Sequence, residues 1–333
     1  MDPSVLLDVR HLRAHFFSDE GTVRAVDGVD FRIMKGETLG VVGESGCGKS
    51  VTAQSILQIL PKNGRIVSDE VLLQANGKVV DLAKPKPNGR EIRNIRGKEI
   101  TMMFQEPMTC LSPVHTIGNQ IEEAIRLHRS ADRKEAREIA VDMLRKCGIP
   151  EPERRVDAYP HQLSGGMRQR AMIAMSLSCR PRLLIADEPT TALDVTVQMQ
   201  ILALLKRLQE SEANTSIILI SHDLGVVAQM CERVCVMYAG TIVEAGTTEE
   251  VLENPRHPYT VGLIESIPRL DVEGQTLNPI PGVVADPIRP PPGCKFNPRC
   301  AHVHDLCRTA RPDLRGVDGG HAAACHLYAE AAP

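Results

Sequence analysis

The sequence predicts an α/β protein in which a parallel sheet carries a helical insertion. Two apolar runs, PRLLIADEP at 181–189 and TSIILISHD at 215–223, are bounded by polar residues, as in strands buried on both faces. An amphipathic helix at 195–210 separates the two runs, which gives a βαβ order. Across residues 115–178, apolar residues recur instead at three- and four-residue steps, which indicates helices.

The composition is that of an ordinary globular protein, and it narrows the possible functions. Of 333 residues, 42% are apolar and 24% are charged, and the net charge is -3. This balance argues against a nucleic-acid-binding protein, and 3% aromatic residues without tryptophan argue against stacking platforms for bases. No run approaches the roughly twenty apolar residues of a membrane span, and the N-terminus does not resemble a secretory signal. We therefore expect a cytosolic chain with reduced cysteines.

The N-terminal part of the chain predicts four strands and one helix. The strands are expected at residues 5–16, 23–33, 37–43 and 69–74. The fourth is expected at the edge of a sheet. The helix, 49–60, follows a glycine-rich loop and ends before Pro61.

The remaining elements follow from helical periodicity and from turn residues. Helices are expected at 116–128 and 130–148, the second opened by Ser130 and closed by Gly148. Near the C-terminus we expect a small hairpin at 239–247, a short helix at 248–255 and an extended proline-rich linker at 279–293.

The glycine-rich loop has the pattern of a phosphate-binding loop. GESGCGKS, Gly43–Ser50, fits G-x-x-x-x-G-K-[ST] and lies between a predicted strand and a predicted helix. Its glycines allow backbone N–H groups to approach phosphate oxygens, and the helix N-terminus favours negative charge. Lys49 supplies a cation to the phosphates, and Ser50 supplies a hydroxyl to Mg²⁺. The predicted nucleotide-binding residues are Gly43, Glu44, Ser45, Gly46, Cys47, Gly48, Lys49, Ser50 and Val51.

An acidic strand end complements this loop. LLIADE, Leu183–Glu188, places two carboxylates directly after four apolar residues. Asp187 is expected to hold Mg²⁺ through water, and Glu188 to polarise an attacking water as general base. The pattern is common by itself, and it gains its meaning from the phosphate loop.

Six motifs in order resemble the ATPase subunit of an ATP-binding cassette (ABC) transporter. They are GESGCGKS at 43–50, FQEP at 104–107, LSGGMRQR at 163–170, LLIADE at 183–188, TALD at 191–194 and SHD at 221–223. The resemblance implies a P-loop NTPase cassette with a RecA-like parallel sheet core, an antiparallel β subdomain and a helical subdomain. A small irregular cysteine-rich extension would follow. The resemblance implies an ATPase core of 1–105 and 180–250, a helical and signature subdomain of 106–179, and an extension of 251–333.

In the family that the chain resembles, the signature segment caps ATP bound to a second cassette. Ser164, Gly165 and Gly166, followed by Met167, would open a helix, so that their N–H groups point outward at a γ-phosphate. Two cassettes would therefore face head to tail and enclose two ATP molecules.

The resemblance also implies roles for other matched residues. Gln105 would sense Mg²⁺ and the attacking water, Asp194 would contact the partner cassette, and His222 would hold the γ-phosphate and orient Glu188. The family stacks an aromatic residue on adenine, and residues 20–23, where one is expected, contain none.

Cys47 lies inside the loop, near Lys49 and a helix N-terminus. Such an environment is expected to lower the pKa of a thiol, so that alkylation would inhibit the ATPase and ATP would protect it. The alternative is a small residue that merely fits.

Longer stretches resemble the oligopeptide, dipeptide and nickel permease branch, among them VVGESGCGKSVTAQSIL and ENPRHPYTVGLIESIPRL. This branch implies a second, distinct ATPase subunit, two transmembrane permeases, an extracytoplasmic solute-binding protein and no nucleic acid. The chain would lie at the cytoplasmic face of the bacterial inner membrane. Peptide is the expected solute, with nickel, oligosaccharides and opine-like compounds as alternatives. A soluble, non-transport ABC ATPase is disfavoured, because there is one cassette and no long coiled-coil insertion.

Four cysteines near the C-terminus suggest a cofactor. Cys294, Cys300, Cys307 and Cys325 stand as C-x5-C-x6-C-x17-C, which does not match the close pairs typical of zinc sites. Four thiolates on irregular loops suit a 4Fe–4S cluster better, and the branch resemblance points the same way. Zinc and free thiols remain as alternatives.

Overall fold

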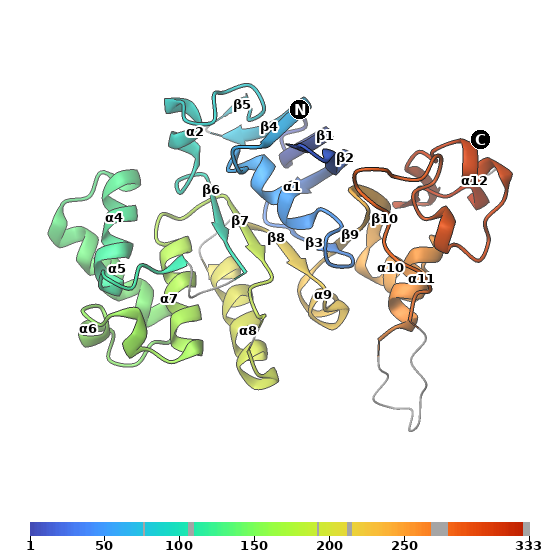
Figure 1. Ribbon diagram of the computed structural model, residues 1–333. Coiled ribbons are helices and arrows are strands. Elements are labelled where there is room, and N and C mark those ends of the chain that lie inside the picture. The colour runs from blue at the N-terminus through green and yellow to red at the C-terminus, as the bar shows by residue number, and fades with distance from the viewer. Residues whose placement is uncertain (76, 106–109, 192, 212–214, 268–278, 329–333) are drawn as a thin grey trace.

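Two β-sheets organise the protein (Figure 1). The computed structural model describes all residues except 76, 106–109, 192, 212–214, 268–278 and 329–333. One sheet is antiparallel with the order β2-β1-β4-β5, and the other is mixed with the order β11-β12-β10-β9-β3-β8-β7-β6. The predicted α/β class is confirmed by this arrangement.

Five neighbouring strands of the mixed sheet, from β9 to the edge strand β6, are parallel. They are β3 (Thr38–Val42), β6 (Ile100–Met103), β7 (Leu183–Asp187), β8 (Ser216–Ser221) and β9 (Arg233–Tyr238). Strands β3, β7 and β8 are buried along their whole length, as their continuous apolar sequences predict. Because the strands are parallel, the loops that leave their carboxyl ends gather at one edge of the sheet.

The antiparallel sheet contains one more strand than the sequence predicted. Its strands are β1 (Val5–Ser18), β2 (Gly21–Met34), β4 (Gly64–Ala75) and β5 (Lys78–Asp81). The expectation that 69–74 forms an edge strand is wrong, because β4 lies between β1 and β5. The edge strand next to β4 is the four-residue β5, which was too short to be recognised by alternation.

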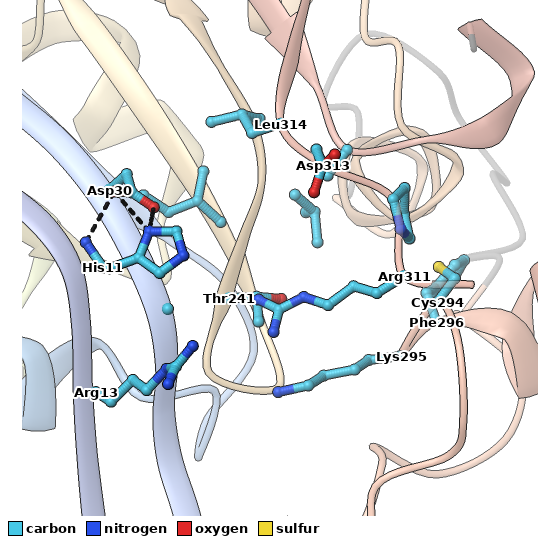
Figure 2. A pocket seen from close by; sticks show the side chains of 15 residues that line it. His11, Arg13, Asp30, Thr241, Cys294, Lys295, Phe296, Arg311, Asp313 and Leu314 are labelled. Carbon is cyan, nitrogen blue, oxygen red and sulfur yellow. Dashed lines mark hydrogen bonds and ion pairs between the residues drawn. The ribbon is translucent and has the colours of Figure 1, made fainter. Parts of the chain in front are cut away.

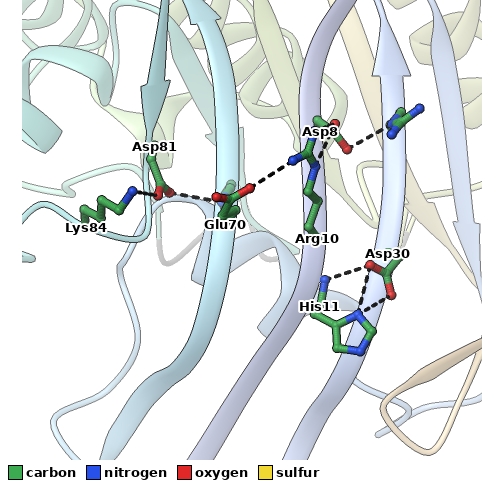
Figure 3. Close-up of polar contacts among 9 residues, drawn as sticks. Asp8, Arg10, His11, Asp30, Glu70, Asp81 and Lys84 are labelled. Carbon is green, nitrogen blue, oxygen red and sulfur yellow. Dashed lines mark hydrogen bonds and ion pairs between the residues drawn. The ribbon is translucent and has the colours of Figure 1, made fainter. Parts of the chain in front are cut away.

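Charged side chains pair across this sheet (Figure 3). Asp8 on β1 is 3% exposed and accepts hydrogen bonds from Arg10 and from Arg32 on β2. Burial acts to raise the pKa of Asp8, but the hydrogen bonds from both arginines outweigh it and lower the pKa. Arg10 also pairs with Glu70 on β4, so the ion pairs tie three adjacent strands together.

The helices follow the predicted periodicity with shifted ends. The longer ones are α1 (Lys49–Ile56), α4 (Ile117–Arg129), α5 (Arg133–Lys146), α7 (Gly165–Leu177) and α8 (Val195–Ser211). The shorter ones are α2 (Arg90–Ile95), α6 (Pro152–Arg155), α9 (Leu224–Met230), α10 (Thr248–Glu253), α11 (Pro258–Glu265) and α12 (Asp305–Thr309). None of the helices in the described ranges combines the length and apolar character needed to cross a membrane.

Two predicted helix ends are wrong. Ser130 does not open α5, because it takes a left-handed conformation that ends α4, and Asp132 caps α5 by accepting the N–H of Glu135. Helix α1 stops at Ile56 instead of residue 60, since Gln58 has a φ of 53°. The C-terminal end of α5 is as predicted, with Gly148 in the left-handed region just beyond the helix.

The C-terminal part of the chain adds strands to the mixed sheet. The hairpin predicted within 239–247 is wrong in detail: this stretch supplies one strand, β10 (Thr241–Thr247), which pairs with β9. On its other side β10 pairs with β12 (His321–Ala323), which pairs in turn with β11 (Arg315–Asp318). The sequence did not predict β11 and β12, because neither is longer than four residues.

The hydrophobic core lies on both faces of the mixed sheet. Along β7, Leu184 and Ala186 pack with the helices, whereas Leu183 and Ile185 pack with the antiparallel sheet. This alternation is the two-residue period of a strand. The helix-facing core reaches Phe296 in the C-terminal part, so that part shares a core with the cassette.

Candidate nucleotide site

The phosphate loop connects β3 to α1 and requires glycine at specific positions. Gly43 and Gly48 have φ values of 149° and 105°. A Cβ at Gly43 would lie 2.2 Å from the carbonyl oxygen of Met237, and one at Gly48 would lie 2.3 Å from that of Ala25. The loop therefore packs backbone against backbone, and larger residues cannot be accommodated without moving it.

Lys49 lies inside this loop. It is 6% exposed, and its Nζ donates to the carbonyl oxygens of Gly43 at 2.7 Å and Glu44 at 3.1 Å. The ammonium group is thus held at the centre of the curved backbone, where an anion entering the loop would meet it.

Cys47 does not have the environment that the sequence predicted. Its side chain is 0% exposed, and burial raises the pKa of the thiol in spite of the nearby Lys49 charge. The prediction of a lowered pKa is therefore wrong. The sequence placed Cys47 near a cation correctly but could not reveal that its side chain points into the core.

Asp187 ends β7 next to the start of α1. It is 4% exposed, and burial raises its pKa, while a hydrogen bond from the Ser50 hydroxyl and the Lys49 charge act in the opposite direction. Within the described residues, its Oδ1 is buried without a hydrogen-bond partner. A buried carboxylate oxygen without a partner beside a serine hydroxyl fits a hard cation such as Mg²⁺.

Two predicted residues, Gln105 and His222, contact Glu188. The Nε2 of Gln105 donates to Glu188 Oε2 at 2.8 Å, and the Nδ1 of His222 lies 3.3 Å from Glu188 Oε1. Thr191, for which the motifs predicted no role, donates to the same Oε2 at 2.9 Å. Glu188 itself has a φ of 48°, an unusual value for a residue with a side chain. Strained backbone of this kind clusters at functional sites.

Strand order explains why these residues meet. The neighbours β3, β8, β7 and β6 end in the phosphate loop, His222, Asp187–Glu188 and Gln105 in that order. Adjacent parallel strands thus bring together residues that are far apart in the sequence (Figure 1).

The signature residues begin helix α7. Ser164 is the N-cap, and its hydroxyl accepts the N–H of Met167 at 3.3 Å. A Cβ at Gly165 would meet nothing within 4 Å, so the surface in front of this helix end is open there. Asp194 caps the next helix, α8, by accepting the N–H of Val197 at 3.0 Å.

Sequence reasoning missed two residues that contact the phosphate loop. The hydroxyl of Tyr259 accepts the N–H of Glu44 at 2.9 Å, and Arg299 forms two hydrogen bonds with the Glu44 carboxylate at 2.8 and 3.1 Å. Neither residue belongs to a local motif that signals such a contact. Both lie more than two hundred positions after Glu44 in the sequence.

The four C-terminal cysteines are free and interact electrostatically. Burial raises the pKa of Cys325 to about 11, and Cys294, Cys300 and Cys307 contribute to this shift. In the part of the chain that is described, however, no three His, Cys, Asp or Glu side chains are grouped so as to hold a metal ion. The zinc alternative therefore does not fit this geometry, and the iron–sulfur prediction gains no support from it.

Several cavities flank the C-terminal part of the chain. One of about 260 Å³ touches Ser45 and Gly46 of the phosphate loop and is walled by residues 284–287. Another, of about 560 Å³, lies away from the loop; Figure 2 shows Lys295 and Arg311 extending across it toward the N-terminal strands.

The strand order, with a phosphate loop at the centre of a mixed sheet and a helical insertion, defines an ATP-binding cassette of the ABC type. Residues 26–191 match the family "ABC transporter", and residues 243–307 match "Oligopeptide/dipeptide transporter, C-terminal region". The chain belongs to the ABC transporter family, whose cassettes hydrolyse ATP.

Similar proteins cover almost the whole chain. The probable peptide ABC transporter ATP-binding protein y4tR of Sinorhizobium fredii is 51% identical, over 96% of this chain and 94% of its own length. The dipeptide transport ATP-binding protein DppD of Bacillus subtilis is 49% identical, over 97% and 94%. Among solved structures, the dimeric cassette MJ0796 in a post-hydrolysis state with ADP and Pi is 26% identical with a TM-score of 0.63, covering 73% of this chain and 99% of that one.

Proposed function

We propose that this chain is the ATP-hydrolysing subunit of a membrane importer for peptides. The contact of Gln105 and His222 with Glu188 beside the phosphate loop carries the hydrolytic part of the proposal. The match of residues 243–307 to the oligopeptide/dipeptide transporter region, together with relatives named for peptide import, supports the peptide. Nickel, oligosaccharides and opine-like compounds are the alternative solutes within the same class.

In this proposal, residues 43–51 bind the ATP phosphates. The loop N–H groups and the N-terminus of α1 would face the phosphate oxygens, and Lys49 would exchange its two carbonyl partners for the β- and γ-phosphates. Ser50, Asp187 and Gln105 would hold Mg²⁺ directly or through water. When bound, Mg²⁺ would neutralise the negative charge that develops on the phosphates.

Glu188 would accept the proton of the attacking water. It would be held in place by the Thr191 hydroxyl and by Gln105. His222 would bind the γ-phosphate and keep the carboxylate and the water in line. The short distances among these side chains support this division of roles, because a general base must be positioned before it can act.

The proposal includes a partner cassette. Ser164, Gly165, Gly166 and Met167 would close over ATP bound to the partner, and Asp194 would contact that partner across the interface. The exposed start of α7 supports this, as does the likeness to a cassette solved as a dimer. Following the branch, we propose that the partner is a distinct chain.

The assembly would also contain two transmembrane permeases and receive its solute from an extracytoplasmic binding protein. This chain would lie at the cytoplasmic face of the inner membrane as a peripheral subunit. We propose that 1–105 and 180–250 form the ATPase core, 106–179 the helical and signature subdomain, and 251–333 the permease-type extension.

Uptake in a strain that lacks this gene tests the proposal. Loss of labelled dipeptide or oligopeptide uptake, restored by the wild-type gene and not by a Lys49→Ala gene, is expected. Unchanged peptide uptake with loss of nickel uptake would favour the nickel alternative. Unchanged uptake of every solute class would contradict a role in import.

We also propose that Cys294, Cys300, Cys307 and Cys325 bind a 4Fe–4S cluster. The N–H of Cys294 donates to the carbonyl oxygen of Cys307 at 2.8 Å, which supports the proximity of these two cysteines. A cube-shaped cluster takes one thiolate at each iron, so its ligands do not converge on one point as zinc ligands do. Anaerobic purification should give a brown protein containing iron and sulfide, bleached by Cys300→Ser. A colourless protein without iron would contradict the proposal.

A further inference from the structure

The C-terminal part of the chain holds the phosphate loop through Glu44. The Glu44 N–H donates to the Tyr259 hydroxyl at 2.9 Å, and its carboxylate binds both terminal nitrogens of Arg299 at 2.8 and 3.1 Å. Its carbonyl oxygen accepts from Lys49. All the polar groups of this residue are therefore engaged, and two of them are fixed from outside the loop.

Arg299 is itself held rigidly. Its side chain is 3% exposed, whereas that of Glu44 is 28% exposed. Its Nε donates to the carbonyl oxygen of Pro281 at 2.8 Å. One of its terminal nitrogens donates to the carbonyl oxygen of Ile280 at 3.3 Å. The guanidinium also lies 5.7 Å from the ring centre of Tyr238. A planar, buried guanidinium that donates four hydrogen bonds is suited to fix the orientation of a carboxylate.

The same segment reaches the other end of the loop. Lys295 donates to the carbonyl oxygen of Ala239 at 2.8 Å. The next residue, Gly240, donates its N–H to the carbonyl oxygen of Cys47 at 2.8 Å. Residues 294–300, bounded by Cys294 and Cys300, thus contact the phosphate loop at Glu44 directly and at Cys47 through one intermediate turn.

We propose that Arg299 is a positioning residue for ATP binding, which couples the cysteine segment 294–300 to the phosphate loop through Glu44. The inference rests on the proposed role of residues 43–51 in binding the phosphates. A loop held in its bound shape loses less conformational freedom when ATP enters, so ATP binds more tightly. Coupling of this kind is reciprocal, and ATP must stabilise the segment to the same extent.

Binding of a non-hydrolysable ATP analogue with Mg²⁺ to the full chain tests whether Arg299 positions the loop for ATP binding. Arg299→Met is expected to weaken binding about tenfold, a typical size for losing a charged bidentate contact. It should raise the KM for ATP while leaving kcat nearly unchanged. Arg299→Lys, which keeps the charge but not the two parallel bonds, should fall in between.

The contact between Arg299 and Glu44 can also be tested by changing Glu44, in case Arg299→Met does not fold. Glu44→Gln changes a partly exposed loop residue, and it should weaken binding to a similar extent. Adding Arg299→Met to Glu44→Gln should cause little further loss, because the two residues act through one contact. Additive losses would overturn the proposal. Arg311→Met is the matched control, since Arg311 also joins the C-terminal part to the cassette, at Asp27, and should leave binding unchanged.

Hydrogen exchange tests whether ATP in turn stabilises the segment 294–300. In the wild-type chain the analogue should slow exchange of the amides in 294–300, and in Arg299→Met it should not. A merely structural role would alter exchange with and without nucleotide alike. Wild-type affinity in both Arg299→Met and Glu44→Gln, with binding abolished by Lys49→Ala, would overturn this inference alone. Retained binding in Lys49→Ala would overturn the proposed phosphate site.

Discussion

The side-chain amide of Gln105 donates to the carboxylate of Glu188 at 2.8 Å, although 83 positions separate the two residues. Gln105 follows β6 and Glu188 follows β7, and these strands are neighbours in the parallel part of the sheet. The contact links the strand that precedes the helical insertion to the proposed general base. A shift of the helical insertion would therefore alter the hydrogen bond between Gln105 and the Glu188 carboxylate.

Glu188→Gln is the most direct test of the proposed chemistry. The variant should bind ATP normally and lose at least about a hundredfold in turnover, since general-base catalysis contributes on that order. Steady-state phosphate release and nucleotide binding measure the two effects. Glu138→Gln on the exposed side of α5 is the matched control and should behave as wild type. Wild-type turnover in Glu188→Gln would exclude Glu188 as the base.

Cys47 should resist alkylation in the native protein. Its side chain is buried and burial raises the pKa of its thiol, so little thiolate is exposed at neutral pH. Mass spectrometry after brief treatment with iodoacetamide at pH 7.5 should find Cys47 unmodified, with or without ATP. The same treatment in denaturant should modify it fully. Rapid native labelling that ATP prevents would restore the reactive-thiol interpretation.

His257 should make the protein less stable in mild acid. It is completely buried at the start of α11, where its Nδ1 accepts the N–H of Tyr259, and burial lowers its pKa to about 3. The unfolded chain, with a histidine pKa near 6.5, binds a proton that the folded chain does not. Stability is therefore full above about pH 6.5 and falls by up to about 1.4 kcal/mol per pH unit below it.

Replacing His257 by asparagine isolates this effect. Asparagine can still accept the Tyr259 N–H but cannot titrate, so His257→Asn should flatten the decline of unfolding free energy between about pH 6 and pH 4. Urea denaturation at several pH values measures the slope. An unchanged slope would show that other groups govern the acid sensitivity.

His321 and Glu244 should be important for stability. They are 2% and 0% exposed, and His321 Nε2 lies 2.6 Å from Glu244 Oε1, which joins β12 to β10. His321→Ala would leave a buried carboxylate with fewer partners, and should lower the unfolding free energy by about 2–3 kcal/mol. His321→Gln, which retains a donor, should cost less. Equal losses in guanidinium denaturation would mean that packing, rather than the hydrogen bond, accounts for the effect.

Local chemistry determined which parts could be predicted. Lys49 and Asp187 were found because the spacing of loop, helix and strand end encodes their roles over a few residues. Tyr259 and Arg299 were missed because their contact with Glu44 depends on how the chain returns after more than two hundred residues. No short-range pattern records such a return.

Errors within the fold have similar physical causes. Ser130 and Asp132 are both good helix caps by type, and only the left-handed backbone of Ser130 shows that it ends one helix instead of starting the next. The neighbours of Cys47 were predicted correctly, but the orientation of its side chain into the core was not. Burial of a side chain depends on packing, which sequence spacing does not specify.

The pairing of β12 with β10 has a consequence for how the protein can be shortened. If the chain were cut before residue 315, the outer backbone groups of β10 would lose their partners. An uncovered strand of this kind is a template on which another copy can add its own strand. Residues 315–323 thus cover β10 at Glu244 and Ala245 and leave the four-residue β11 as the edge strand, and so short an edge is a poorer template for another copy.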